Sequence, residues 1–180
     1  SNLDVYSLKA YTGKYEKYVA IGEYTINNRV DYILEQIYKE KPDVLCFSCY
    51  IWNMDYVEEL ITEYHKLCPE VPIWVGGPEV SYEVETFFAE HPQVTGVMIG
   101  EGERTFEQLC GYYVNKTGSL EEIRGIAFLN REMGRLFSHR HRNRWICQKS
   151  HFATITLKTL KIVLFTMNQS VAVHSSAATV

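Results

Sequence analysis

Hydrophobic residues in the first part of the chain follow two alternating patterns. One is a short continuous apolar run, as in Val44-Leu-Cys-Phe-Ser-Cys49, which is typical of a strand buried on both faces of a parallel sheet. The other is an apolar stripe at intervals of three and four residues, as at Val57, Leu60, Ile61 and Tyr64, which predicts an amphipathic helix. Because such strands and helices alternate, the pattern predicts an α/β domain.

These elements can be placed along residues 1–132, the predicted extent of the domain. Helices are expected near residues 3–11, 30–38, 57–68, 80–88 and 106–113, and strands near 18–26, 44–49, 72–75, 96–99 and 123–129. Short apolar strands joined by helices of this length indicate a doubly wound parallel sheet. Because the chain opens on a helix, we expect the first strand of the fold to be missing, with its place before Ser1.

Three loops follow predicted strands and lie at the edge where doubly wound sheets bind ligands. They are residues 50–53, 76–79 and 100–103, and the last two are rich in glycine. Glycine lets the backbone approach a ligand closely, and the next helix points its N-terminal amides at that ligand. Ordinary turn chemistry explains a Gly-Gly-Pro turn alone, and acidic residues at a helix start also complement the helix dipole. Three such loops at one edge favour a binding site.

Two segments resemble a known family. Ile73-Trp-Val-Gly-Gly-Pro-Glu79, followed after about 20 residues by Val97-Met-Ile-Gly-Glu-Gly-Glu-Arg-Thr-Phe106, is similar to the cobalamin-binding domain that precedes the radical domain in many radical S-adenosylmethionine enzymes. The segment from Pro42 to Tyr50 resembles the third strand of that family, and the likeness covers about residues 1–130. It implies a flavodoxin-like (Rossmann-like) fold, cobalamin as cofactor and a radical S-adenosylmethionine domain in cis as partner.

The resemblance also implies a role for the three loops. In that family they hold the lower side of the corrin ring and its nucleotide tail. We carry this cofactor-binding role to the matching positions, which are Ser48, Tyr50, Trp52, Asn53, Gly76, Gly77, Pro78, Gly100, Glu101, Gly102 and Glu103. Other cobalamin proteins ligate cobalt with a histidine from the loop after the first strand, and that loop would also lie before Ser1.

Other candidate chemistry is weaker. Cys46 and Cys49 have the spacing of a redox pair, but such a pair opens a helix, whereas these residues lie in a predicted buried strand, which favours core packing. His65 and His91 lack companions at metal-ligand spacing. The sequence therefore predicts no catalytic residue and no metal ligand in this chain.

Composition restricts the location and the partners. The five cysteines form no disulfide framework, which fits a reducing cytoplasm. A net charge of -4 gives no reason to expect nucleic acid as a partner. No apolar run approaches the roughly 20 residues that cross a bilayer, so no membrane association is expected.

The end of the chain differs in composition. All 22 acidic residues lie at or before Glu132, whereas seven of the 18 basic residues follow it: Arg135, Arg140, Arg142, Arg144, Lys149, Lys158 and Lys161. A basic arm and a disordered extension would both produce such a composition. Residues 155–165, however, are more apolar than a solvated tail would be.

The genetic code offers another interpretation. A shifted reading frame joins the last base of each codon to the first two bases of the next. In that frame Met167 and Asn168 encode Glu, and the codons that follow permit the cysteine spacing Cys-x3-Cys-x2-Cys. In radical S-adenosylmethionine enzymes that spacing holds three irons of a [4Fe-4S] cluster, whose fourth iron binds S-adenosylmethionine. We therefore expect residues 134–180 to be an out-of-frame tail that replaces the linker and the start of the radical domain. Such a tail should pack poorly, and the chain as written would lack the cluster.

The sequence thus predicts the cobalamin-binding domain of a radical S-adenosylmethionine enzyme, and the resemblance implies methyl transfer as the commonest reaction of such enzymes. Two alternatives remain open. A free-standing corrinoid-binding or sensing module would share this sheet and have a folded C-terminus. A receiver-like signalling domain would also share it, but needs an acceptor Asp at the end of the middle strand, where this chain has Ser48, Cys49 and Tyr50.

Overall fold

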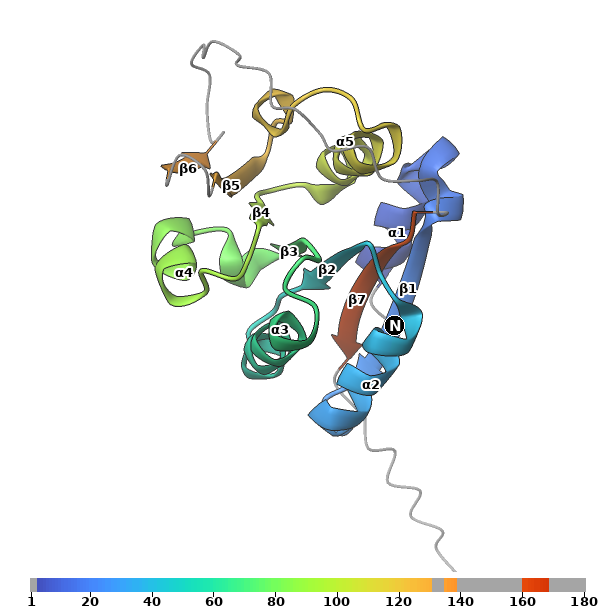
Figure 1. The fold of residues 1–180 in the computed structure, drawn as a ribbon, viewed down its shortest axis with the longest axis vertical. Coiled ribbons are helices and arrows are strands. Elements are labelled where there is room, and N and C mark those ends of the chain that lie inside the picture. The colour runs from blue at the N-terminus through green and yellow to red at the C-terminus, as the bar shows by residue number, and fades with distance from the viewer. Residues whose placement is uncertain (1–2, 131–134, 139–159, 169–180) are drawn as a thin grey trace, which may run out of the picture.

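The computed structural model describes residues 3–130, 135–138 and 160–168, which form one seven-stranded sheet with helices on both faces (Figure 1). The strands are β1 (Val19–Thr25), β2 (Val44–Ser48), β3 (Ile73–Gly76), β4 (Gly96–Met98), β5 (Ile126–Asn130), β6 (Arg135–Ser138) and β7 (Ile162–Asn168). The α-helices are α1 (Leu3–Tyr11), α2 (Val30–Glu40), α3 (Met54–Leu67), α4 (Val84–Glu90) and α5 (Gly102–Asn115). Short 3-10 helices are η1 (Gly13–Tyr18), η2 (Pro78–Val80) and η3 (Leu120–Glu122). Among the described residues, no helix combines the length and the apolar character that a membrane span requires.

The strand order identifies the architecture. The strands lie in the order β1-β7-β2-β3-β4-β5-β6, and every pair from β1 to β4 is parallel. With β7 taken as the first strand, the parallel part follows the flavodoxin-like order 2-1-3-4-5. The predicted α/β fold with a doubly wound parallel sheet is therefore confirmed.

Side chains leave the central strands alternately toward two apolar layers, as the period of a strand requires. In β2, Leu45 and Phe47 face the layer formed with α2, α3 and α4, whereas Val44 and Cys46 face the layer formed with α1 and α5. All four are buried, with at most 1% of each side chain exposed. Burial on both faces explains why these strands are continuously apolar in the sequence.

The place expected for a missing first strand is filled by β7, which was not predicted (Figure 1). Its residues pair in parallel with β1, from Val19 opposite Ile162 to Thr25 opposite Asn168, and also with β2. Phe165 faces one apolar layer and Leu164 the other. The expectation that residues 134–180 pack poorly is therefore wrong for residues 160–168, because their continuous apolar run suits a strand buried on both faces.

The other edge of the sheet departs from the predicted parallel arrangement. β5 pairs antiparallel with β4, and β6 pairs antiparallel with β5. Thus β6 extends the sheet beyond the predicted boundary at residue 132, and a short hairpin places it antiparallel to its neighbour. The remainder of the predicted tail, residues 139–159 and 169–180, lies outside the described residues, and its out-of-frame origin stays a prediction.

Candidate functional site

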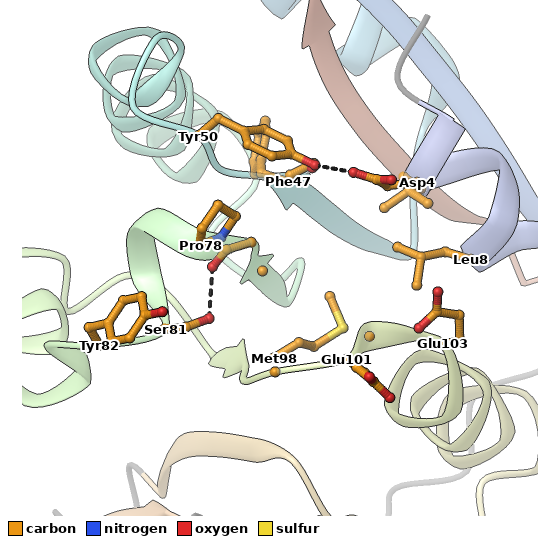
Figure 2. Close-up of a pocket in the computed structure, with 16 residues that line it drawn as sticks. Asp4, Leu8, Phe47, Tyr50, Pro78, Ser81, Tyr82, Met98, Glu101 and Glu103 are labelled. Atoms are coloured by element: carbon orange, nitrogen blue, oxygen red, sulfur yellow. Dashed lines mark hydrogen bonds between the residues drawn. The ribbon is translucent and has the colours of Figure 1, made fainter.

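A cavity of about 390 Å³ lies at the carboxyl ends of the central parallel strands (Figure 2). Its lining comes from four strands, from the loops that follow three of them, from α1 and from the first turn of α5. The lining residues are Asp4, Leu8, Phe47, Ser48, Tyr50, Gly76, Gly77, Pro78, Ser81, Tyr82, Met98, Gly100, Glu101, Gly102, Glu103 and Leu164. The structure thus brings together every predicted site residue except Trp52 and Asn53.

The loop after β2 is held by the side chain of Asn53. Its amide nitrogen donates to the carbonyl oxygen of Ser48 at 3.0 Å, and its Oδ1 accepts from the backbone N–H of Tyr50 at 2.8 Å. The side chain is buried and caps no helix. Asn53 therefore supports the backbone of the loop from the protein interior and does not line the cavity.

Trp52 lies next to the cavity lining. Its ring stacks on the ring of Tyr50, with centroids 4.6 Å apart and an interplanar angle of 8°. Trp52 is 41% exposed and its neighbour Ile51 is 77% exposed. Tyr82, which lines the cavity, is also 77% exposed, so aromatic rings in the lining and next to it are open to solvent.

The second loop requires glycine at position 77. Gly77 has φ +117° and ψ 172°, a region that only glycine adopts readily. A Cβ atom there would collide with the carbonyl oxygen of Cys49, whose N–H donates to the carbonyl of Gly76 at 2.7 Å. The first two loops are therefore in direct backbone contact, and the Ser81 hydroxyl, which donates to the Gly77 carbonyl at 2.7 Å, closes the turn.

The third loop leads into α5. Gly100 has φ +80°, and a Cβ added there would meet no atom within 4 Å, so its backbone borders open space. Glu101 is the N-cap residue of α5, but its side chain makes no capping hydrogen bond. The free backbone N–H groups of the first helical turn and the positive end of the helix dipole therefore lie beside the cavity.

The residues that sequence analysis missed come from elements with no local signal of binding. Phe47, Met98 and Leu164 lie within strands and form an apolar floor. Asp4 and Leu8 belong to α1, and Leu8 contacts the start of α5, since a Cβ on Gly102 would lie 3.0 Å from it. Only the packing of α1 against α5 brings these two residues to the cavity.

The lining is mixed in chemical character. It combines an apolar floor with three carboxylates, from Asp4, Glu101 and Glu103, and with exposed glycine backbone. Within the ranges that the structure describes, no three His, Cys, Asp or Glu side chains are grouped so that they could hold a metal ion.

The cysteine pair near the site belongs to the core. Cys46 lies in β2 and Cys49 directly after it, and both are fully buried. Burial raises the pKa of Cys49 to about 12 and the pKa of Cys46 well above its usual value. Neither thiol is therefore ionised near neutral pH, which confirms the packing interpretation over a redox role.

Comparison with protein families gives a match over most of the domain. Residues 2–110 match the family model described as the B12 binding domain. Two curated proteins are similar over shorter stretches. One is the 2-(S-pantetheinyl)-carbapenam-3-carboxylate methyltransferase of Streptantibioticus cattleyicolor, 42% identical over 71 residues, which are 38% of this chain and 10% of that protein. The other is the cobalamin-dependent radical SAM methyltransferase TokK of Streptomyces tokunonensis, 38% identical over 87 residues, 48% of this chain and 13% of that protein.

Solved structures show the same fold. The cobalamin-dependent S-adenosylmethionine radical enzyme OxsB with aqua-cobalamin bound superposes with a TM-score of 0.63 at 21% identity, covering 79% of this chain and 20% of OxsB. Its apo form gives a TM-score of 0.61 at 22% identity, covering 76% and 19%. The chain thus matches only about a tenth of the curated relatives and a fifth of OxsB.

Proposed function

The chain belongs to the B12 binding domain family and is related to cobalamin-dependent radical SAM methyltransferases; on that premise we propose that its cavity holds cobalamin on behalf of a radical enzyme. The observation that carries the proposal is the convergence of three loops and the start of α5 on one cavity at the carboxyl edge of the sheet. Ligands of doubly wound domains bind at this edge.

The residues present fit the chemistry of cobalamin. The cofactor has a wide corrin ring fringed with amide side chains and a nucleotide tail. Its amide N–H groups are donors, for which Glu101 and Glu103 offer carboxylate acceptors. Gly100 leaves room for backbone contact, because a Cβ atom there would extend into open space. When bound, cobalamin would supply a cobalt centre able to carry a methyl group.

Individual roles follow from position in the site. We assign contact with the cofactor to the residues that line the cavity in the three loops: Ser48, Tyr50, Gly76, Gly77, Pro78, Gly100, Glu101, Gly102 and Glu103. Trp52 would contact the part of the cofactor that lies across the mouth, since a cavity of about 390 Å³ takes only part of so large a molecule. Asn53 would act indirectly, by holding the backbone of the first loop.

A titration tests the proposal. Purified protein is titrated with hydroxocobalamin and its visible spectrum is recorded; we expect a saturable spectral change at micromolar concentrations. A spectrum that never departs from that of the free cofactor would overturn the proposal. Gly100→Ala should weaken binding about tenfold, equivalent to ~1.4 kcal/mol, because the methyl group enters the cradle.

Gly118→Ala is the matched control for that variant. Gly118 also has a positive φ, +86°, so an alanine there carries similar backbone strain. It lies after the far end of α5 and outside the cavity lining. The two variants should lose similar stability, whereas only Gly100→Ala should lose affinity for hydroxocobalamin.

We further propose that the intact protein carries a radical S-adenosylmethionine domain in cis, with a [4Fe-4S] cluster, and transfers a methyl group. The named activities of the two curated relatives support this, as does the Cys-x3-Cys-x2-Cys string that the shifted frame of the tail permits. Sequencing the nucleotides is the test. Three cysteine codons in an open shifted frame are expected, and stop codons there would end the hypothesis.

The relatedness to cobalamin-dependent radical SAM methyltransferases does not favour the alternative of a free-standing corrinoid-binding or sensing module. We also propose a reducing compartment such as the cytoplasm. The described cysteines Cys46, Cys49, Cys68 and Cys110 are all free thiols, as expected where glutathione keeps them reduced.

A further inference from the structure

One hydrogen bond crosses the mouth of the cavity and joins two distant segments of the chain (Figure 2). The hydroxyl of Tyr50, in the loop after β2, donates to Oδ2 of Asp4, in the first turn of α1, at 2.5 Å. The two residues are 46 positions apart. A hydrogen bond to an ionised carboxylate is shorter and stronger than one between neutral groups.

The α1 side of this bond is held firmly. Val5, next to Asp4, is fully buried in the apolar layer shared with α5. Leu8 packs at the start of α5, and the hydroxyl of Tyr6 donates to Glu23 of β1 at 3.0 Å. The Asp4 carboxylate therefore extends from a helix that is fixed to the sheet on two sides.

On the other side, the loop backbone and the aromatic side chains are held by different contacts. Asn53 fixes the backbone of Tyr50 through two hydrogen bonds. That does not set the direction of the phenol ring, which projects over the cavity. The bond to Asp4 constrains that direction, and the Trp52 ring stacks on the Tyr50 ring with the two planes nearly parallel.

We propose that Asp4 is a positioning residue, which orients the Tyr50–Trp52 aromatic pair at the mouth of the cavity and through it sets the affinity for cobalamin. The inference rests on the proposed function for its ligand. It assigns a role to α1, which carries none of the glycine-loop motifs and from which no site residue was predicted.

The test uses four variants of the full chain: Asp4→Ala, Asp4→Asn, Tyr50→Phe and the double variant Asp4→Ala/Tyr50→Phe. Hydroxocobalamin affinity is measured by visible titration. Asp4→Ala and Tyr50→Phe should each weaken binding about threefold to tenfold, the range expected for one partly exposed hydrogen bond. The double variant should be no weaker than either, because both changes remove the same bond. Asp4→Asn should stay within about twofold of the original, since its amide oxygen still accepts the hydroxyl.

A second measurement needs no ligand. The protein is labelled with 5-fluorotryptophan, and the Trp52 fluorine resonance is assigned with Trp52→Phe. It should shift or broaden in Asp4→Ala and Tyr50→Phe and remain in place in Asp4→Asn. The resonance of Trp74, which is fully buried, should be unchanged in all variants and reports an intact core.

The two measurements separate two failures. If the unaltered chain does not bind hydroxocobalamin, the proposed function fails, while the fluorine spectra still decide whether Asp4 orients the aromatic pair. An unmoved Trp52 resonance in Asp4→Ala, or losses of affinity that add in the double variant, would overturn the positioning role itself.

Discussion

The indole ring of Trp74 in β3 lies across Gly96, its direct partner in the neighbouring strand β4. A Cβ atom at position 96 would overlap the six-membered part of that ring. The ring cannot easily move aside, because it is fully buried and its Nε1 donates to the hydroxyl of Tyr113 at 2.8 Å. A glycine in the strand thus makes room for the largest side chain of the core.

Gly96→Ala should therefore destabilise the fold by about 3 kcal/mol, the upper part of the range for an overpacked core. Urea unfolding followed by circular dichroism measures the change. Gly22→Ala, in β1, is the matched control, because its added Cβ would lie 3.3 Å from the partly buried Tyr24 ring and 3.5 Å from Phe165, which are far milder contacts. The double variant Gly96→Ala/Trp74→Phe should recover part of the loss. Equal stability of the two alanine variants would contradict this packing.

Phe165 provides a test of β7. Its ring is 1% exposed, stacks on Tyr24 at 5.1 Å and meets the edge of Phe47 at 5.2 Å. Phe165→Ala should lower the free energy of unfolding by about 3–5 kcal/mol, as for other buried phenylalanines. Phe137→Ala, on the edge strand β6, should cost less, because that ring is only partly buried. If chemical denaturation finds Phe165→Ala neutral, β7 does not complete the sheet, and residues 160–168 behave as the arbitrary tail that the sequence predicted.

The strands and loops that could be predicted from the sequence carry local signals. The run from Val44 is apolar at consecutive positions because β2 is buried on both faces, and Gly76 and Gly77 follow β3 because the turn there excludes side chains. Parallel strands end at one edge of the sheet, so the strand pattern alone predicts that the loops after them lie close together. This explains why nearly all predicted site residues line one cavity.

The parts that could not be predicted depend on contacts between distant segments. Asp4 and Leu8 look like ordinary helix residues, and only the packing of α1 beside α5 places them at the cavity. β7 was missed for a different reason. The apolar run that starts at Ile162 lies within a long basic segment that contains no acidic residue, and that composition indicated a poorly packed tail. The composition of a long segment, however, says little about one buried strand within it. Asn53 was predicted to contact the cofactor, and the sequence does not show that its side chain is buried and bonds the backbone of the loop.

Gly77→Ala should remove both stability and cobalamin binding. An alanine there would need a backbone conformation that only glycine tolerates, and its Cβ would strike the carbonyl oxygen of Cys49, which is fixed backbone. We expect a loss of at least about 3 kcal/mol in the free energy of unfolding. Gly13→Ala is the control, since φ is +52° there and no atom lies within 4 Å of the added Cβ. We expect this variant to lose only about 1 kcal/mol in the free energy of unfolding. Thermal unfolding with and without hydroxocobalamin compares the two. A Gly77→Ala protein as stable as Gly13→Ala would mean that the first two loops are not in contact.

Two buried thiols predict how stability changes in alkali. Burial raises the pKa of both Cys49 and Cys110 to about 12, from an ordinary value of 9.0. Above about pH 9 the unfolded chain therefore releases protons that the folded chain still holds, and the free energy of unfolding falls as pH rises toward 12. In this pH window each thiol lowers the free energy of unfolding by up to about 1.4 kcal/mol for each pH unit. Below pH 9 both states keep the proton, so these thiols cause no change there.

Urea unfolding at about pH 8 and about pH 10.5 measures this fall. Buried tyrosines add to it, since burial also raises the pKa of Tyr113, so the thiol contribution is isolated by substitution. Cys110→Ala should reduce the difference between the two pH values, because one raised pKa is removed. Val114→Ala, which shortens an apolar side chain of the same helix and removes no titratable group, should leave the difference unchanged. If the two variants lose the same amount of stability between the two pH values, the Cys110 thiol ionises as readily in the folded chain as in the unfolded one, and solvent reaches the layer between α5 and the sheet.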